Sequence, residues 1–339
     1  MTGFPLTTWE RRAPEDLGID AAGLERAHRW LDATAGSDGY RFALVKDGYL
    51  VDEQCRGYAP EQLLSIASAA KSIYSNVLGI AVEEKQLPSA DAQVVTIYPE
   101  MMDVPEGKGP KEGRYAYPKD REITFRQLIC NTSGYMKPGE EPGQIFHYQT
   151  YGMNVLTHAI ARAYGLYDVD NPESEPGFAA LVETKVGGPI GARWRYSLTN
   201  FDLHPEARIG VFGYYTQIHT TALDLARVGW LWANWGRWGD TQVVPEGWMR
   251  GAVKVNPDLI ANAPMNEWRY GHGFWTNEQG LLWPDLPRDG FTAAGAGGHA
   301  ASVFPSLGLV IVQNPGPYRR DGTHANPELL ALVLEAVRA

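Results

Sequence analysis

The sequence predicts a mixed α/β (α+β) fold, in which an antiparallel sheet flanked by terminal helices lies beside a mostly helical region. Strand-like patterns occur near both ends of the chain, helical patterns lie outside them, and helices, glycine and proline dominate the stretch between. We therefore expect residues 1–67 and 268–339 to form a discontinuous α/β sandwich layer. Residues 68–267 are expected to form the mostly helical region, with a cleft at the boundary.

The first predicted elements are a helix and a hairpin. Apolar residues recur at helical spacing over 20–34, and Asp20 stands before them as a candidate N-cap. Two strand-like runs within 41–55 surround Asp47-Gly48, a dipeptide that supplies the positive φ of a tight hairpin turn. An antiparallel sheet is expected to start at this hairpin.

The central stretch is predicted to consist of helices and loops. An apolar stripe formed by Ile73, Val77, Ile80 and Ala81 predicts a buried helix over 68–85. Further helices are expected, in chain order, over 124–130, 151–164, 177–183, 217–235 and 244–253.

Strand patterns return after residue 270. They cover 273–275, 291–304 and 309–313, and a helix over 326–339 closes the chain. Eight of the 11 tryptophans fall between Trp230 and Trp283. This clustering indicates aromatic packing where two layers meet, with pocket lining as the alternative.

Composition excludes several classes of protein. The 339 residues carry a formal net charge of −10, which gives no electrostatic basis for binding nucleic acid or an anionic membrane. No apolar run approaches the roughly 18 residues of a spanning helix, and the amino terminus lacks the pattern of a secretory signal. Cys55 and Cys130 are too few for a disulfide framework and are expected to be reduced. We expect a cytoplasmic protein.

A serine and a lysine three residues apart form the first candidate site. Ser68-Ala69-Ala70-Lys71 is the only S-x-x-K sequence in the chain, and this spacing on a helix places both side chains on one face. A lysine that loses its charge can accept the proton of a serine nucleophile. The four residues taken alone fit equally well a helix-starting serine beside a solvated lysine.

Several segments in a fixed order add to this motif. They are SIASAAKSIYSNVLGIAVEEKQL, ITFRQLICNTSGY, PGQIFHYQTYGMNVLTHAIARAYG, TTALDLARVGWLWANWGRW and GFTAAGAGGHAASVFPSLGLVIV. Together they resemble the superfamily of serine hydrolases that contains class C β-lactamases, penicillin-recognising carboxylesterases and 6-aminohexanoate-dimer hydrolases. The resemblance extends from about Leu17 to Val312 and implies a β-lactamase-like fold.

The resemblance implies a role for Tyr148, which matches the tyrosine of the family's Y-x-N motif. In the family this residue relays the proton of the nucleophile and returns it to the leaving atom. The chain has Thr150 where the family has asparagine, so a hydroxyl rather than an amide is available to hydrogen-bond the lysine.

The third motif of the family, Lys or His followed by any residue and Gly, matches Ala293-Ala294-Gly295. The basic residue that holds a substrate carboxylate in β-lactamases and peptidases of the family is therefore missing. Gly295 fits a strand against which a substrate lies closely, and the amides of Ser68 and Ala296 are expected to form the oxyanion hole. A bulge at Gly297, Gly298 and His299 is the alternative.

The remaining histidines are given minor roles. His299 is expected to be supporting or purely structural, and His147 is expected to point away from Tyr148 in an extended segment. The chain contains no H-E-x-x-H, no Walker loop and no G-x-S-x-G elbow. No metal and no cofactor are expected.

These observations predict a serine hydrolase that forms an acyl-enzyme on Ser68, with Lys71 and Tyr148 as the proton relay. Its expected partner is a small-molecule substrate, with esters or small amides preferred. One alternative is β-lactamase or D-amino-acid peptidase activity, with Arg319 or Arg320 replacing the missing cation. A second alternative is a catalytically silent binding scaffold. The physiological substrate and the oligomeric state stay open.

Overall fold

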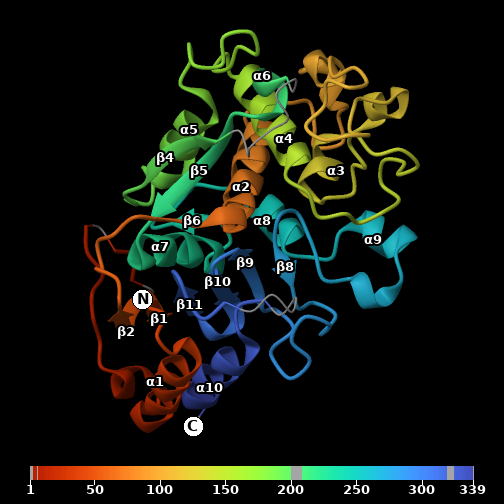
Figure 1. Cartoon of the computed structure of the whole chain (residues 1–339). Helices are drawn as coiled ribbons and strands as arrows, with labels where there is room; N and C mark the ends of the chain where they lie inside the picture. Colours follow the sequence, from red (N-terminus) through yellow and green to blue (C-terminus); the bar gives the residue numbers. More distant parts are fainter. Residues whose placement is uncertain (1–2, 6, 200–207, 319–323, 339) are drawn as a thin grey trace.

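The computed structural model describes all residues except 1–2, 6, 200–207, 319–323 and 339. Figure 1 shows a sheet with two terminal helices in its lower part and a group of helices and loops above it. This is the mixed helix and antiparallel-sheet architecture that the sequence predicts, and the predicted fold class is confirmed.

The main sheet is built from both ends of the chain. In the described residues it has six antiparallel strands in the order β2-β1-β11-β10-β9-β8. Phe42 of the amino-terminal hairpin lies opposite Gln313 near the carboxyl terminus, so the two ends depend on each other for their hydrogen bonds. The strands are β1 (Tyr40–Lys46), β2 (Tyr49–Arg56), β8 (Trp275–Thr276), β9 (Phe291–Gly295), β10 (His299–Phe304) and β11 (Leu309–Gln313).

Helices cover both faces of this sheet. The terminal helices α1 (Ala21–Ala35) and α10 (Pro327–Arg338) lie side by side against one face. Helix α7 (Ala222–Ala233) lies against the other face. Because neighbouring residues on a strand point to opposite faces, Phe42 and Leu44 of β1 pack toward the terminal helices, whereas Ala43 and Val45 pack toward α7.

The first two predicted elements form as expected. The carboxylate of Asp20 accepts a hydrogen bond from the amide of Ala22, which caps α1 at the predicted residue. Asp47 and Gly48 have φ values of 52° and 86° and turn β1 into β2. The hairpin and the helix before it are therefore confirmed.

The helical region is arranged around α2 (Ala70–Glu83), which runs through its middle and is almost wholly buried. The helix predicted over 68–85 thus starts two residues later, after a 3₁₀ turn at Ala67–Ala69. The other helices of the region are α3 (Phe125–Ile129), α4 (Tyr151–Ala163), α5 (Gly177–Val182), α6 (Ile209–Phe212), α8 (Glu246–Ala252) and α9 (Pro257–Asn262).

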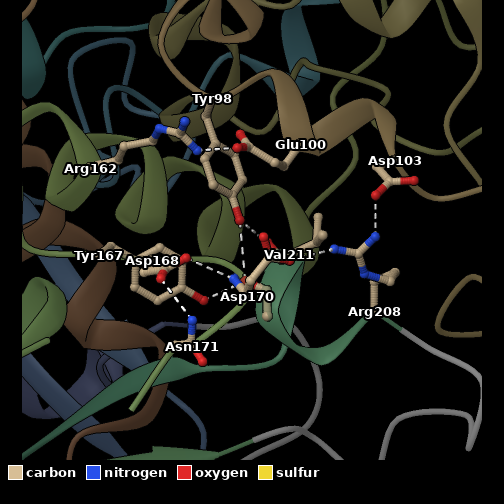
Figure 2. Close-up of polar contacts among 11 residues, drawn as sticks. Tyr98, Glu100, Asp103, Arg162, Tyr167, Asp168, Asp170, Asn171, Arg208 and Val211 are labelled. Carbon is tan, nitrogen blue, oxygen red and sulfur yellow. Dashed lines mark hydrogen bonds and ion pairs between the residues drawn. The ribbon is translucent and has the colours of Figure 1, made fainter. Parts of the chain in front are cut away.

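Figure 2 shows how polar contacts hold α4 and α6 at the outer edge of the helical region. Arg162 of α4 pairs with Glu100, and Arg208, just before α6, pairs with Asp103. The hydroxyl of Tyr98 donates to two carbonyls within α6, each at 3.2 Å. None of these residues lines the cleft described below, so we assign the cluster a structural role.

The prediction of one helix over 217–235 is wrong at its start. Residues Tyr215–Thr220 form strand β5, which pairs with β3 (Leu64–Ser65) and β4 (Arg195–Thr199) in a small antiparallel sheet. The helix begins only after Thr221, whose hydroxyl accepts a hydrogen bond from the amide of Asp224. Strand pairing with segments far along the chain overrides the local helical pattern here.

The prediction of one strand over 291–304 is also wrong. The segment is a hairpin of β9 and β10, because Gly297 and Gly298 take φ values of 87° and 81° and reverse the chain. Neither the single strand nor the bulge considered from sequence is formed. A further two-stranded hairpin, β6 (Arg237–Trp238) and β7 (Thr241–Gln242), follows α7.

Helix α7 bears on the predicted division of the chain. It lies within 68–267, the range assigned to the helical region, yet it covers a face of the main sheet. The division into 1–67 plus 268–339 and 68–267 therefore stays a prediction. Searching the described helices for a long apolar stretch of the kind that crosses a bilayer gave none.

Candidate active site

Ser68 and Lys71 lie where the main sheet meets the helical region. Ser68 is in the 3₁₀ turn that precedes α2, and Lys71 is in the first turn of that helix. The Nζ atom of Lys71 donates a hydrogen bond of 2.8 Å to Oγ of Ser68. Only 1% of the Lys71 side chain is exposed, so this contact is held inside the protein. The alternative of a solvated lysine is excluded.

Tyr148 lies at the same place, although it comes from a distant part of the chain. It precedes α4 and lines a cleft together with Ser68. The Nζ atom of Lys71 lies 4.6 Å from the centre of the Tyr148 ring. Trp275 stacks on that ring at 5.8 Å, and Tyr270 meets it edge-on at 5.9 Å. The structure thus brings the serine, the lysine and the phenol together.

Asn131 holds the segment that carries Tyr148. Its side-chain oxygen accepts a hydrogen bond from the amide of Gln149 at 3.0 Å, and its carbonyl accepts one from the amide of His147 at 2.8 Å. Its Nδ2 donates to the hydroxyl of Tyr270 at 3.3 Å. Asn131 belongs to the threonine-serine-glycine block noted in the sequence, but nothing in the sequence indicates that it brackets Tyr148.

The charge of Lys71 differs from the expectation that it is lost. Burial acts to lower the pKa of Lys71, but the neighbouring phenols of Tyr148 and Tyr215 raise it, and the resulting pKa lies above the ordinary lysine value. At neutral pH the side chain is therefore an ammonium. In that form it donates to Ser68 and favours negative charge on a phenol beside it.

Thr150 does not take the expected position beside the lysine. In the described residues no hydrogen bond joins the Thr150 hydroxyl to Lys71, and Thr150 precedes α4 without capping it through its side chain. Tyr215 of β5 is instead close enough for its charge and that of Lys71 to shift each other's pKa. Sequence reasoning missed Tyr215 because it missed the strand that carries it.

Gly295 brings strand β9 against the turn that contains Ser68. A Cβ atom at this glycine would lie 2.1 Å from the carbonyl oxygen of Ile66 and 3.1 Å from the amide nitrogen of Ser68. Only a residue without a side chain allows this approach. The next residue, Ala296, lines the same cleft as Ser68, so the two amides proposed as oxyanion donors border one space.

We predict that Gly295→Ala lowers the rate of ester hydrolysis about a hundredfold, since the added methyl group must separate β9 from the serine turn and misalign the oxyanion donors. Overpacking of this kind also costs roughly 1–3 kcal/mol of stability. Gly251→Ala is the matched control, because nothing lies within 4 Å of a Cβ there. Steady-state rates and thermal melting of both variants test the prediction, and an unimpaired Gly295→Ala enzyme would contradict it.

The cleft has a volume of about 610 Å³ and extends from Ser68 across the turn between β9 and β10. Its described wall contains no lysine or arginine. Arg319 and Arg320, considered from sequence as substitutes for the missing cation, lie outside the described residues. Trp275 lines the cleft, whereas Trp230 and Trp283 are buried in the cores, so each of the two interpretations of the tryptophans applies to some of them.

The histidines near the cleft differ in position. His299 lines the cleft and is 9% exposed, whereas His147 is exposed and contacts Glu140 at 3.1 Å. The described residues contain no group of three or more His, Cys, Asp or Glu side chains placed to bind a metal ion. Cys55 and Cys130 are not joined in a disulfide.

Comparisons with known proteins were made on the whole chain. A model of the family described as Beta-lactamase matches residues 24–314. No relative was found among curated protein sequences. Solved structures with the same fold are numerous, and three of them illustrate the range.

A family VIII carboxylesterase has a TM-score of 0.67 and 16% identity, over 95% of this chain and 98% of its own. A penicillin-binding protein homologue from Caulobacter crescentus has a TM-score of 0.65 and 16% identity, over 94% and 99%. A β-lactamase from Mycobacterium bovis has a TM-score of 0.62 and 18% identity, over 93% and 99%. At these identities the likenesses show the fold alone.

Proposed function

The chain belongs to the β-lactamase family, and we propose that it is a serine hydrolase that cleaves esters or small amides through an acyl-enzyme on Ser68. The observation that carries the proposal is the 2.8 Å hydrogen bond between Lys71 and Ser68 in a cleft that Tyr148 also lines. A hydroxyl is a weak nucleophile unless a neighbouring group accepts its proton, and this site offers such a group.

Tyr148 is the proton acceptor in this mechanism, and Lys71 supports it as an ammonium. The positive charge next to the ring favours the phenolate, which takes the proton of Ser68 as the hydroxyl oxygen attacks the carbonyl carbon of the substrate. Lys71 keeps the Ser68 oxygen in place through its hydrogen bond. The same phenol then returns the proton to the leaving oxygen or nitrogen.

The tetrahedral intermediate needs donors for its negative oxygen. The amides of Ser68 and Ala296 border the cleft from two elements that the close approach at Gly295 holds together. Collapse of the intermediate leaves the acyl group on Ser68 and releases the alcohol or amine. Water then attacks the acyl-enzyme, with Tyr148 again accepting and returning the proton.

The wall of the cleft favours an uncharged substrate. The described lining has no lysine or arginine to pair with a carboxylate, and it offers the aromatic side chains of Trp275 and Tyr318. An apolar acyl group is therefore a better match than the anionic substrates of β-lactamases or D-amino-acid peptidases.

We predict a higher kcat/KM for short p-nitrophenyl esters than for nitrocefin, since the ester needs no cationic partner in the cleft. Parallel assays of the two substrates with the full-length chain measure the preference. A greater kcat/KM for nitrocefin would replace the proposal with β-lactam hydrolysis.

A silent binding scaffold is tested by covalent labelling. The proposal predicts that a fluorophosphonate adds to the wild-type chain and that Ser68→Ala abolishes the addition. Equal absence of label from both proteins would favour the scaffold instead.

A further inference from the structure

His299 stands directly beside the proposed catalytic elements. It is the first residue of β10 and lies opposite Gly295 of β9 in the antiparallel register. Directly opposed residues point to the same face of a sheet, with Cβ positions about 5 Å apart. Since a Cβ at Gly295 would point at the turn that carries Ser68, the His299 side chain extends on that face too.

The two ring nitrogens of His299 have different surroundings. Nδ1 is buried and has no hydrogen-bond partner in the part of the chain that the structure describes. Nε2 is on the side of the turn between β9 and β10, since a Cβ at Gly297 would lie 3.3 Å from it. The ring as a whole lines the cleft with Ser68 and Ala296.

These surroundings select one neutral form of the ring. Burial, followed by the positive charge of Arg41, lowers the pKa of His299 to about 4, so the ring is uncharged at neutral pH. A buried N–H without an acceptor costs more than a buried lone pair without a donor. The proton therefore belongs on Nε2, which leaves a bare Nδ1 in the interior and an N–H group at the cleft.

The other polar side chains in this part of the cleft are engaged. Nδ2 of Asn326 donates to Gln313 and to the carbonyl of Pro317, and the ring of His324 stacks on Trp275 at 3.8 Å. His299 has no such partner in the described chain and is nine-tenths buried. A ligand is the partner that its N–H group lacks.

We propose that Nε2–H of His299 binds an uncharged oxygen of the substrate, and that the substrate class is esters or amides with a second oxygen acceptor near the scissile carbonyl. A carbonyl, ether or hydroxyl oxygen has the right chemistry, because a neutral imidazole N–H donates to it without a charge on either side. This inference rests on the proposed hydrolase function and names a substrate feature that the function alone does not require.

The test uses pairs of esters that differ by one oxygen in place of a methylene group. On the acyl side the pair is p-nitrophenyl methoxyacetate and p-nitrophenyl butyrate. On the alcohol side it is 2-methoxyethyl acetate and butyl acetate. The ratio of kcat/KM within each pair is measured for wild type, His299→Leu and His299→Gln, so that the intrinsic reactivity of the esters cancels between enzymes.

For one of the two pairs, His299→Leu is expected to lower the ratio roughly threefold to tenfold, the effect of one neutral hydrogen bond. His299→Gln, which keeps an N–H donor on a side chain of similar reach, is expected to restore most of it. Unchanged ratios for both pairs in His299→Leu would overturn the inference. Hydrolysis of no ester by the wild type, or equal hydrolysis by Ser68→Ala, would instead overturn the proposed function.

A measurement on the wild-type chain keeps the inference open to refutation if the variants do not fold. Nitrogen-15 NMR of the imidazoles distinguishes the two neutral tautomers. The inference requires His299 to be neutral and protonated on Nε2 at pH 7. A charged ring, or a proton on Nδ1, would overturn it.

Discussion

Lys71→Ala is expected to lower kcat for ester hydrolysis by at least about a hundredfold, the range found for residues that take part in proton transfer. The substitution removes the donor that holds the Ser68 oxygen at 2.8 Å and the positive charge that favours ionised Tyr148. Steady-state kinetics with a p-nitrophenyl ester measure the loss. The rate of acylation, read from the burst of p-nitrophenol, is expected to fall with it.

A second lysine variant separates the role of this site from a general effect of charge. Lys111→Ala removes an exposed lysine outside the cleft and is expected to keep normal turnover. Thermal melting shows whether Lys71→Ala stays folded, because emptying a buried position leaves a cavity. A folded Lys71→Ala enzyme with near-normal turnover would remove Lys71 from the mechanism.

Tyr148→Phe is expected to have an effect of similar size, again at least about a hundredfold on kcat. The change deletes only the hydroxyl, so the ring still stacks on Trp275 and still meets Tyr270 edge-on. The fold is therefore expected to be preserved, and the loss traces to the proton acceptor. Kinetics on the same ester, together with thermal melting, test both parts.

The matched control for this variant lies in the same cleft. Tyr318→Phe deletes the hydroxyl of a tyrosine that also lines the cleft but has no contact with Lys71 in the described chain. It is expected to keep turnover within about threefold of wild type. Equal losses in the two variants would show that the cleft is sensitive to any lost hydroxyl and would argue against a specific role for Tyr148.

The parts of the fold that depend on local chemistry were predictable from sequence. Asp20 caps α1 where its side chain can reach a free amide, and Asp47-Gly48 makes the hairpin turn because these residues tolerate positive φ. The apolar stripe of α2 marks a helix that is buried. Each of these signals lies within a few residues of the structure that it specifies.

The parts that were missed depend on partners far along the chain. Strand β4 is largely exposed or half-buried and has no strong pattern of its own; it exists because β5 pairs with it. The start of α7 could have been found, since Thr221 followed three residues later by Asp224 is a capping signal. The hairpin at Gly297-Gly298 had its turn residues in view but no cue to its register.

The candidate site shows the same division. The spacing of Ser68 and Lys71 follows from helix geometry, and the resemblance to a known family supplies Tyr148. The roles given to Asn131 and Tyr215 follow only from the fold, because each acts on a residue from another segment. The charge of Lys71 also needed the structure, since burial and nearby phenols act on its pKa in opposite directions.

The most direct test of the central claim is the mass of the peptide that contains Ser68 after brief reaction of the intact protein with a panel of esters, amides and β-lactams. The account predicts an added acyl group on Ser68 with at least one ester, the strongest signal with uncharged acyl groups, and no adduct in Ser68→Ala. Turnover of an ester with the acyl group on another residue, or with no adduct on trapped wild-type protein, would contradict it.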